Sequence, residues 1–378
     1  MYSPSRRELL ATVALAGGTA IAGCLDAASS GSPTSAESAV GESDHPSCEP
    51  ARPEADGGDP VPIVDRSLPQ EYEFDELLEA SLDGGPGPDG IPSIDDPVFA
   101  PAGEPPENLA DGDPVFGVVL DGVAKAYPQY VFVWHEIVND VVGDESVAVT
   151  YCPLTGTAQG FYRGDATFGV SGELINSNLV MFDRETESWW PQMLAQGITD
   201  EHEGAFLGEF QVTWSTWGQW RDRHPGTVVL TEETRYVRDY GSDPYGGYNP
   251  TSGYYSPDDE NTLFPPLATD DRFAPKEAVI GARTADGAAA VPKDRLREAG
   301  LLEWSMEDEP YLAVFDPALE TGHVYRNPDG LELEFDDGAV VVDGDGFPPD
   351  DLPLDCELGV DAMWFAWYGY YPSTEVVE

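Results

Sequence analysis

The chain has 378 residues, 41% of them hydrophobic, which is enough for a sizeable core in one large domain or two small ones. It has 71 acidic residues against 18 basic ones, a formal net charge of -53. This balance argues against nucleic-acid binding, because phosphate contacts require clustered Lys and Arg. Such a surface is typical of proteins adapted to high salt, which screens charges over about 3 Å at 1 M. A surface that binds cations or basic partners is the alternative.

Residues 1–23 have the pattern of an export signal. Arg6 and Arg7 precede an apolar run, and this run is shorter than the about 20 residues that a membrane-spanning helix needs. An arginine pair before such a run is typical of a twin-arginine (Tat) signal peptide. The run ends at Cys24 in a lipobox-like sequence, whose cysteine becomes the lipidated first residue. We therefore predict a haloarchaeal-type lipoprotein, exported and anchored to the outer face of the cell membrane through Cys24.

Residues 24–62 are rich in Ser, Gly, Ala, Asp, Glu and Pro and have no apolar periodicity. This composition predicts a flexible acidic tether. Cys48 lies in the tether and Cys356 near the other end of the chain, and an oxidising compartment would allow a disulfide between them. Residues 63–113 are expected to form an irregular N-terminal extension with one short helix over residues 72–80.

Residues 114–372 are predicted to form a single, mainly β domain (β-rich α+β) of short strands and hairpins with small helical insertions. A hairpin is expected where residues 115–120 and 123–127 flank an Asp-Gly pair. A helical turn over residues 128–134 and two strands follow, over residues 135–142 and 146–151. The second of these strands ends at Cys152.

Downstream, the same mixture of short strands and small helices continues. Further strands are expected over residues 161–162, 167–170, 179–182, 227–231, 277–283, 311–315, 323–326 and 331–342. One helix begins near Thr216, which has capping-box spacing to Gln219, and another covers residues 292–299 with Gly300 at its end. The aromatic run over residues 362–371 is interpreted as core. We find no internal repeat.

A series of segments resembles a known family. The segments are Ala126-Tyr-Pro128, Trp134-His-Glu-Ile-Val-Asn-Asp140, Val149-Thr-Tyr-Cys-Pro-Leu-Thr-Gly-Thr157, Ser171-Gly172, Asn176-Ser-Asn178, Met181-Phe-Asp-Arg-Glu-Thr-Glu-Ser188, Trp217, Arg238-Asp-Tyr-Gly241 and Trp364-Phe-Ala-Trp367. In this order they resemble domain of unknown function 3179, a family that includes selenoproteins. The resemblance implies a shared fold and no particular reaction. Many relatives carry Cys, and some selenocysteine, where this chain has Thr155, which argues against a two-thiol redox cycle here.

Cys152 is the leading candidate for chemistry. A thiolate can act as a nucleophile or bind a soft metal, and a neighbouring group such as His135 can lower its pKa. Adjacent strands could bring the two together, so we select Cys152, His135, Thr155 and Glu136 as candidate catalytic residues. Cys152 and His135 are also candidate ligands for copper or another thiophilic metal. The alternative is a small buried thiol beside a satisfied core histidine, with Thr155 capping a turn.

Five further residues are predicted to bind substrate. Asp183, Arg184 and Glu187 follow a strand, and Arg238 and Tyr240 lie in one of the segments with family resemblance. A structural ion-pair cluster explains the first three residues equally well.

Two functions follow from these residues. The first is a cell-surface lipoprotein with a Cys/His redox or metal-binding centre and an unidentified redox partner. The second is a non-catalytic, extracytoplasmic ligand-binding protein that uses the Tyr-rich loop over residues 239–259, since long irregular loops often carry function. The tyrosines in or just before this loop, which could equally form its own packing core, are Tyr236, Tyr240, Tyr245, Tyr248, Tyr254 and Tyr255.

Overall fold

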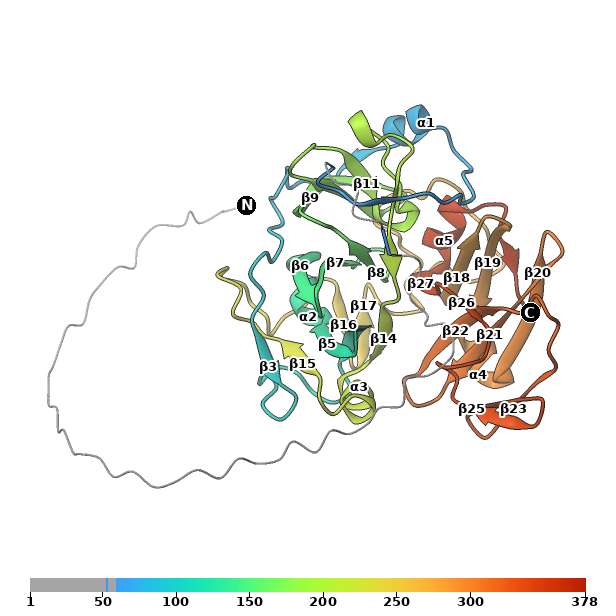
Figure 1. Cartoon of the computed structure of the whole chain (residues 1–378). Helices are drawn as coiled ribbons and strands as arrows, with labels where there is room; N and C mark the ends of the chain where they lie inside the picture. The colour runs from blue at the N-terminus through green and yellow to red at the C-terminus, as the bar shows by residue number, and fades with distance from the viewer. Residues whose placement is uncertain (1–51, 54–58) are drawn as a thin grey trace, which may run out of the picture. The chain divides into compact units, whose positions relative to one another are not determined.

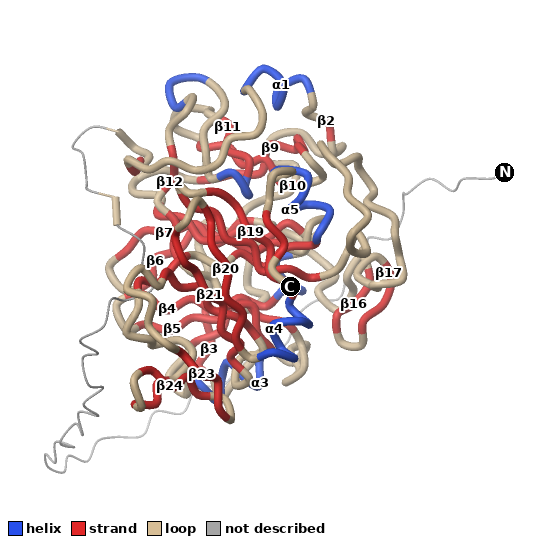
Figure 2. The backbone as a smooth tube through the Cα atoms, turned by 90° about the vertical axis from the view of Figure 1, so that its right-hand side faces the viewer, coloured by secondary structure: helices blue, strands red, loops and turns tan. Residues whose placement is uncertain are grey.

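The structure is a computed structural model that describes residues 52–53 and 59–378 (Figure 1). The predicted signal peptide, Cys24, Cys48 and most of the predicted tether lie outside the described residues. Strands dominate and the helices are short (Figure 2), which confirms the mainly β fold class. Within the described part of the chain, no helix is both long and apolar enough to cross a membrane.

The domain contains the same series of elements twice. The first series is β4 (Pro114–Leu120), β5 (Val123–Pro128), α2 (Gln129–Phe132), β6 (Ile137–Val142), β7 (Glu145–Cys152) and β8 (Thr157–Tyr162). The second is β18 (Ala278–Thr284), β19 (Gly287–Pro292), α4 (Lys293–Ala299), β20 (Leu301–Met306), β21 (Glu309–Asp316) and β22 (Thr321–Arg326). Each strand of the second series begins and ends the same number of residues after its counterpart in the first series. This offset holds from the first strand start, at Pro114 and Ala278, to the last strand end, at Tyr162 and Arg326.

Later segments complete each series in the same way. In the first, β13 (Glu209–Phe210) joins β8, β14 (Thr213–Thr216) joins β4, and β15 (Val228–Leu230) follows α3 (Trp217–Arg223) to run parallel to β5. In the second, β26 (Asp355–Glu357) joins β22, β27 (Val360–Met363) joins β18, and β28 (Glu375–Val376) follows α5 (Trp364–Tyr370) to run parallel to β19. We call residues 114–162 and 209–230 the first repeat, and residues 278–326 and 355–376 the second repeat.

The two repeats also share packing contacts. The indole N–H of Trp220 donates to Thr227 Oγ1 at 3.0 Å, and Trp367 donates to Thr374 Oγ1 at the same distance. Each of these rings covers a strand glycine. A Cβ added to Gly117 would lie 2.1 Å from the Trp220 ring, and one added to Gly281 would lie 2.2 Å from the Trp367 ring. Both strands therefore require glycine here.

The prediction that the chain has no internal repeat is wrong. Few matching positions carry the same residue, and different insertions divide the two copies, so the sequence shows no regular period. The first insertion contains β9 (Phe168–Ile175), β10 (Asn178–Asp183), β11 (Trp189–Pro191), η1 (Gln192–Leu194), η2 (Asp200–His202) and β12 (Phe206–Leu207). The second contains β23 (Leu333–Asp336), β24 (Ala339–Val342) and β25 (Asp345–Phe347).

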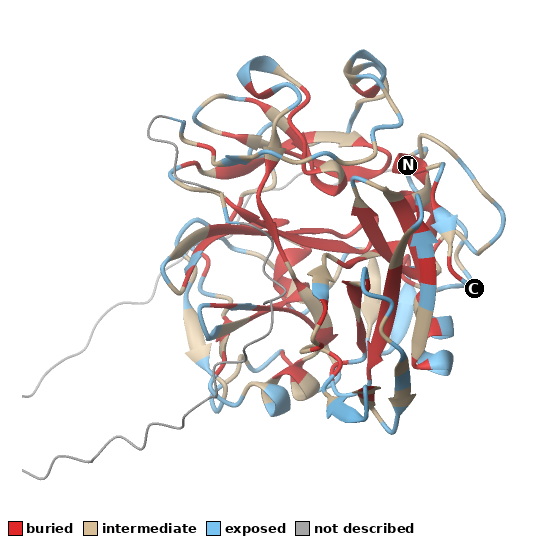
Figure 3. Cartoon of the chain, turned by 45° about the vertical axis from the view of Figure 1, so that its right-hand side comes forward, coloured by how far each residue is buried: buried red, intermediate tan, exposed pale blue. Residues whose placement is uncertain are grey.

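The remaining elements lie before and between the repeats. The N-terminal segment contains β1 (Ile63–Val64), α1 (Phe74–Glu79), β2 (Leu82–Asp83) and β3 (Phe99–Pro101). Its three strands pair with β12, β9 and β15, so this segment is part of the folded domain. The Tyr-rich loop contains a small hairpin, β16 (Gly246–Tyr248) and β17 (Thr251–Gly253). Buried residues follow the strands of the repeats, whereas exposed ones lie mainly in outer loops and helices (Figure 3).

Candidate functional site

Cys152 and Glu136 lie at the same end of one sheet. Cys152 is the last residue of β7, and Glu136 immediately precedes β6, the antiparallel neighbour of β7. The backbone N–H of Tyr151 donates to the Glu136 carbonyl at 2.7 Å, which extends the pairing by one residue. The turn after Cys152 leads directly into β8, where Thr157 pairs with Cys152.

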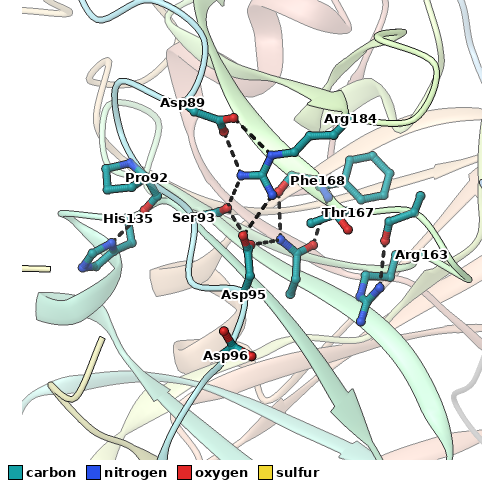
Figure 4. Close-up of polar contacts among 12 residues, drawn as sticks. Asp89, Pro92, Ser93, Asp95, Asp96, His135, Arg163, Thr167, Phe168 and Arg184 are labelled. Carbon is teal, nitrogen blue, oxygen red and sulfur yellow. Dashed lines mark hydrogen bonds and ion pairs between the residues drawn. The ribbon is translucent and has the colours of Figure 1, made fainter. Parts of the chain in front are cut away.

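The structure does not bring His135 to Cys152. The strands around them are adjacent, as expected, but Glu136 has a left-handed backbone (φ 58°) and ends the regular strand geometry before His135 is reached. His135 is fully buried, with Nδ1 2.7 Å from the Pro92 carbonyl (Figure 4) and Nε2 2.7 Å from the Tyr240 hydroxyl. Burial lowers the pKa of His135 to about 4, and the positive charge of Arg238 acts in the same direction.

A neutral His135 satisfies both of these contacts. Nδ1–H donates to Pro92, and Nε2 accepts from Tyr240, so neither nitrogen is available to a metal without losing a buried hydrogen bond. In the part of the chain that the structure describes, no group of three or more His, Cys, Asp and Glu side chains could hold a metal ion. This donor arrangement does not fit the predicted copper-type centre at Cys152 and His135. It fits a core histidine, the alternative in the sequence interpretation.

The thiol of Cys152 is buried and surrounded by polar groups. It is 1% exposed, and Sγ lies 3.6 Å from the Ser177 carbonyl in the turn between β9 and β10. Burial raises the pKa of Cys152 to about 11, and the negative charge of Glu136 adds to the rise. The Thr155 hydroxyl and the backbone N–H groups of Leu179 and Thr155 hydrogen-bond the sulfur and lower its pKa. These donors would stabilise a thiolate once it formed.

Thr155 contributes its hydroxyl to this site. Its Oγ1 accepts from Asn178 Nδ2 at 3.0 Å, which leaves the hydroxyl proton to point at the sulfur of Cys152. Asn178 also donates to Gln192 Oε1 at 2.8 Å, and Gln192 donates to Thr150 Oγ1 at 2.8 Å. This buried chain of hydrogen bonds fixes the direction of the Thr155 hydroxyl. The sequence interpretation did not select Asn178 or Gln192, although Asn178 lies in a segment with family resemblance.

The Glu136 side chain is mostly buried and has no polar partner among the described residues. The residue is 8% exposed, and no other described residue forms a hydrogen bond or an ion pair with its side chain. Burial raises the pKa of Glu136 to about 8. A buried carboxyl without a partner and a left-handed backbone at a residue other than glycine both cost stability, and such features cluster at functional sites.

The second repeat serves as an internal comparison for this site. The counterpart of Glu136 is Gly300, which also has a positive φ of 78° and ends α4. Because the fold requires a left-handed backbone here, glycine is the residue that meets the requirement without strain. The first repeat instead places a glutamate at this position, directly beside the thiol.

The other two site residues also differ between the repeats. Asp316 takes the place of Cys152, and Leu319 takes the place of Thr155. Asp316 accepts the backbone N–H groups of Ala318 and Leu319 at 2.8 Å and 3.3 Å, so it acts as a turn cap. The carboxyl, the thiol and the hydroxyl therefore occur together in the first repeat alone.

Arg184 and His135 contact consecutive residues of the N-terminal segment, Ser93 and Pro92 (Figure 4). Arg184 is bound by Asp89, Ser93 and Asp95 at 2.8 to 3.1 Å (Figure 4). Asp183 is buried and accepts from the Trp190 indole at 3.0 Å. The exposed Glu187 donates its backbone N–H to the Asp183 carbonyl at 2.9 Å. Arg184 therefore forms ion pairs with Asp89 and Asp95, whereas the structure shows no ion pair for Asp183 or Glu187 within the described residues.

The Tyr-rich loop packs over the Cys152 turn. Tyr254 donates its hydroxyl to the Leu154 carbonyl at 2.7 Å, and Tyr245 packs against the apolar cluster that contains Cys152. Burial raises the pKa of both tyrosines, and a charge on Cys152 would raise it further. Tyr248 stacks on Tyr255 with ring centroids 4.0 Å apart. The loop therefore forms both a packing core and the cover of the thiol.

Cys152 is the free cysteine of the described residues. Cys356 is disulfide-bonded, and its partner lies outside the described part of the chain. The pairing of Cys356 with Cys48 therefore stays a prediction.

Comparison with known proteins gave one match. Residues 88–374 match the sequence profile of a family described as "Protein of unknown function (DUF3179)". No curated protein and no solved structure matches the chain. The matched region includes the first repeat, the first insertion, the Tyr-rich loop and the second repeat as far as Thr374. Because the match covers most of its length, the chain belongs to the DUF3179 family.

Proposed function

We propose that this protein is a single-cysteine redox enzyme in which Cys152 reacts with a small peroxide and Glu136 moves the proton. The observation that carries the proposal is the unpartnered, buried Glu136 carboxyl beside a buried thiol that already receives hydrogen bonds. At a pH above about 8, Glu136 is ionised and Cys152 is a thiol. Transfer of the thiol proton to Glu136 removes the carboxylate charge that opposes the thiolate.

The step with hydrogen peroxide balances without another cofactor. The Cys152 thiolate attacks one peroxide oxygen, the O–O bond breaks, and the leaving hydroxide takes the proton from Glu136 to become water. The sulfur is oxidised to a sulfenic acid, and the peroxide is reduced. Two external thiols can return the sulfenic acid to the thiol, with release of their disulfide and water. At 1% exposure, the sulfur is shielded from a protein disulfide, so the proposal requires an oxidant as small as a peroxide.

The absence of a nearby second thiol also favours this reaction. Thr155 lies where a Cys-x-x-Cys motif would have its second cysteine, and Cys152 is the free cysteine of the described residues. An internal disulfide therefore cannot form at the site within that part of the chain, and the sulfenic acid must be reduced by an external thiol. We further propose that the reaction takes place outside the cell membrane, supported by the Tat-type signal and the lipobox at Cys24.

The test is trapping of the oxidised sulfur. The folded protein in high salt is treated with hydrogen peroxide and dimedone, and the adduct is located by peptide mass spectrometry. We expect one adduct on Cys152 in the wild type, loss of the adduct in Cys152→Ser, and much slower labelling in Glu136→Gln at high pH. The exposed-site variant Glu303→Gln serves as a matched control with wild-type labelling. No adduct on Cys152 in the folded wild type would refute the proposal.

A non-catalytic binding role is the second candidate. One observation favours it, a cavity of about 370 Å³ beside the Tyr-rich loop, lined by aromatic side chains. In that case ligand binding would persist in Cys152→Ser and no peroxide reaction would be seen.

A further inference from the structure

The cavity beside the Tyr-rich loop lies between the two repeats. Its volume is about 370 Å³, in the range of small-molecule sites. Among the lining residues, Tyr248 and Tyr255 come from the loop, Gly156 and Trp214 from the first repeat, and Met363 from the second. The cavity therefore reaches the turn that follows Cys152, although Cys152 itself does not line it.

Three aromatic rings form one wall of this cavity. Tyr248 stacks on Tyr255 with an interplanar angle of 22°, and Trp214 meets Tyr248 edge-on with ring centroids 5.3 Å apart. Rings in this arrangement offer electron-rich faces to a cation. The same region already holds one cation in this way, since Lys276 Nζ lies 3.5 Å from the centre of the Tyr254 ring.

The charged residues that line the cavity leave a negative excess. Lys293 is paired with Asp361 at 2.5 Å, and Lys276 is paired at 3.1 Å with Asp259, which does not itself line the cavity. Glu277 also lines the cavity, and no described residue forms an ion pair or a hydrogen bond with its carboxyl. Burial and the nearby Asp294 raise the pKa of Glu277, as expected for a carboxylate without a positive partner.

We infer that this cavity binds a small organic ammonium ion, with the ammonium group against the aromatic wall and Glu277 as its counter-charge. Stacked tyrosines, a tryptophan and an unpaired carboxylate are the groups that recognise such cations. Inorganic cations in a saline medium gain less from ring faces than from water, so the aromatic wall would select the organic ion. This inference does not depend on the thiol chemistry proposed for Cys152.

The test uses choline as the probe and 3,3-dimethylbutan-1-ol as its uncharged isostere, in calorimetric titrations of the full-length protein in high salt. We expect choline to bind about tenfold more tightly than the isostere. Trp214→Leu and Glu277→Gln should each weaken choline binding by about the same factor. The control Glu303→Gln alters an exposed carboxyl away from the cavity and should bind as the wild type does.

Each outcome decides the inference. No choline binding, equal binding of the two probes, or binding unchanged in both cavity variants would overturn it. Circular dichroism of the variants separates loss of the site from loss of the fold. Cys152→Ser should bind choline normally, so failure of the peroxide reaction would leave this result unaffected.

Discussion

Replacing Glu136 with glycine should stabilise the protein, because the second repeat has Gly300 at the same position. The backbone is left-handed at both residues, and a Glu136→Gly variant keeps that conformation without a strained side chain. The change also removes a buried carboxyl that no described residue pairs. Its expected effect depends on pH, and the sign follows from the raised pKa of Glu136.

The magnitude follows from the two pKa values of Glu136, the ordinary value of 4.5 in the unfolded chain and about 8 in the folded protein. Below 4.5 the group is protonated in both states and has no pH-dependent effect. Between these two pKa values the free energy of unfolding falls by about 1.4 kcal/mol per pH unit, because the unfolded chain releases the proton first. Above the pKa of the folded protein the loss of stability stays constant. The full loss of unfolding free energy in the wild type is on the order of 5 kcal/mol as an upper limit. The gain in the glycine variant is smaller, because the variant also loses the packing contacts of the Glu136 side chain.

The assay is unfolding by guanidinium chloride, followed by tryptophan fluorescence at about pH 4.5 and about pH 9, which bracket the titration. We expect Glu136→Gly to be close to the wild type at the lower pH and more stable by several kcal/mol at the higher one. The reciprocal control is Gly300→Ala, whose new Cβ would lie 2.1 Å from the Phe335 ring. This control should lower stability equally at both pH values. If wild type and Glu136→Gly show the same pH dependence, Glu136 is not the buried, uncompensated acid described above.

Four further substitutions test the roles assigned to other residues. Tyr240→Phe leaves the buried His135 Nε2 without its donor and should cost about 1 to 3 kcal/mol in unfolding free energy without changing the rate of thiol oxidation; a change in that rate would reinstate His135 in the reaction. Gly117→Ala and Gly281→Ala should each cost several kcal/mol by denaturant titration, because both added methyl groups meet a tryptophan ring; a mild effect at only one of them would argue against equivalent repeats. Thr155→Val removes a hydrogen-bond donor from the sulfur of Cys152 and should slow alkylation of the thiol, measured by mass spectrometry, while an unchanged rate would assign Thr155 to packing alone.

The sequence predicted the local elements of this fold well. The Asp-Gly pair marked the hairpin of β4 and β5, and Thr216 caps α3 through Gln219 as its spacing indicated. Gly300 ends α4, as expected from its position after the helix. These features depend on neighbouring residues, so a single sequence is sufficient to find them.

The sequence did not predict the repeat or the partner of Cys152. The repeat is conserved in strand lengths, turn lengths and two tryptophan contacts rather than in residue identity, and different insertions interrupt it. His135 is the partner predicted from the sequence because adjacent strands could bring it to Cys152. The left-handed backbone of Glu136 changes this geometry, and no local pattern marks a glutamate in that conformation.

The role of Asn178 is another feature that the sequence did not predict. It reaches Thr155 from the first insertion, so its role depends on how β9 and β10 pack against β7. Contacts between elements distant in sequence are set by tertiary packing, which periodicity does not reveal. The cavity beside the Tyr-rich loop has the same origin, since both repeats and the loop supply its walls.

The pH dependence of Cys152 alkylation tests the central claim most directly. If Cys152 and Glu136 share a proton, the wild-type rate should rise with pH and then level off above about 8, where Glu136 is ionised. In Glu136→Gln the rate should continue to rise through this range towards the pKa of the thiol, with no break near 8. A wild-type rate that rises without a break, parallel to that of Glu136→Gln, would show that the two groups do not exchange a proton and would contradict the proposed site.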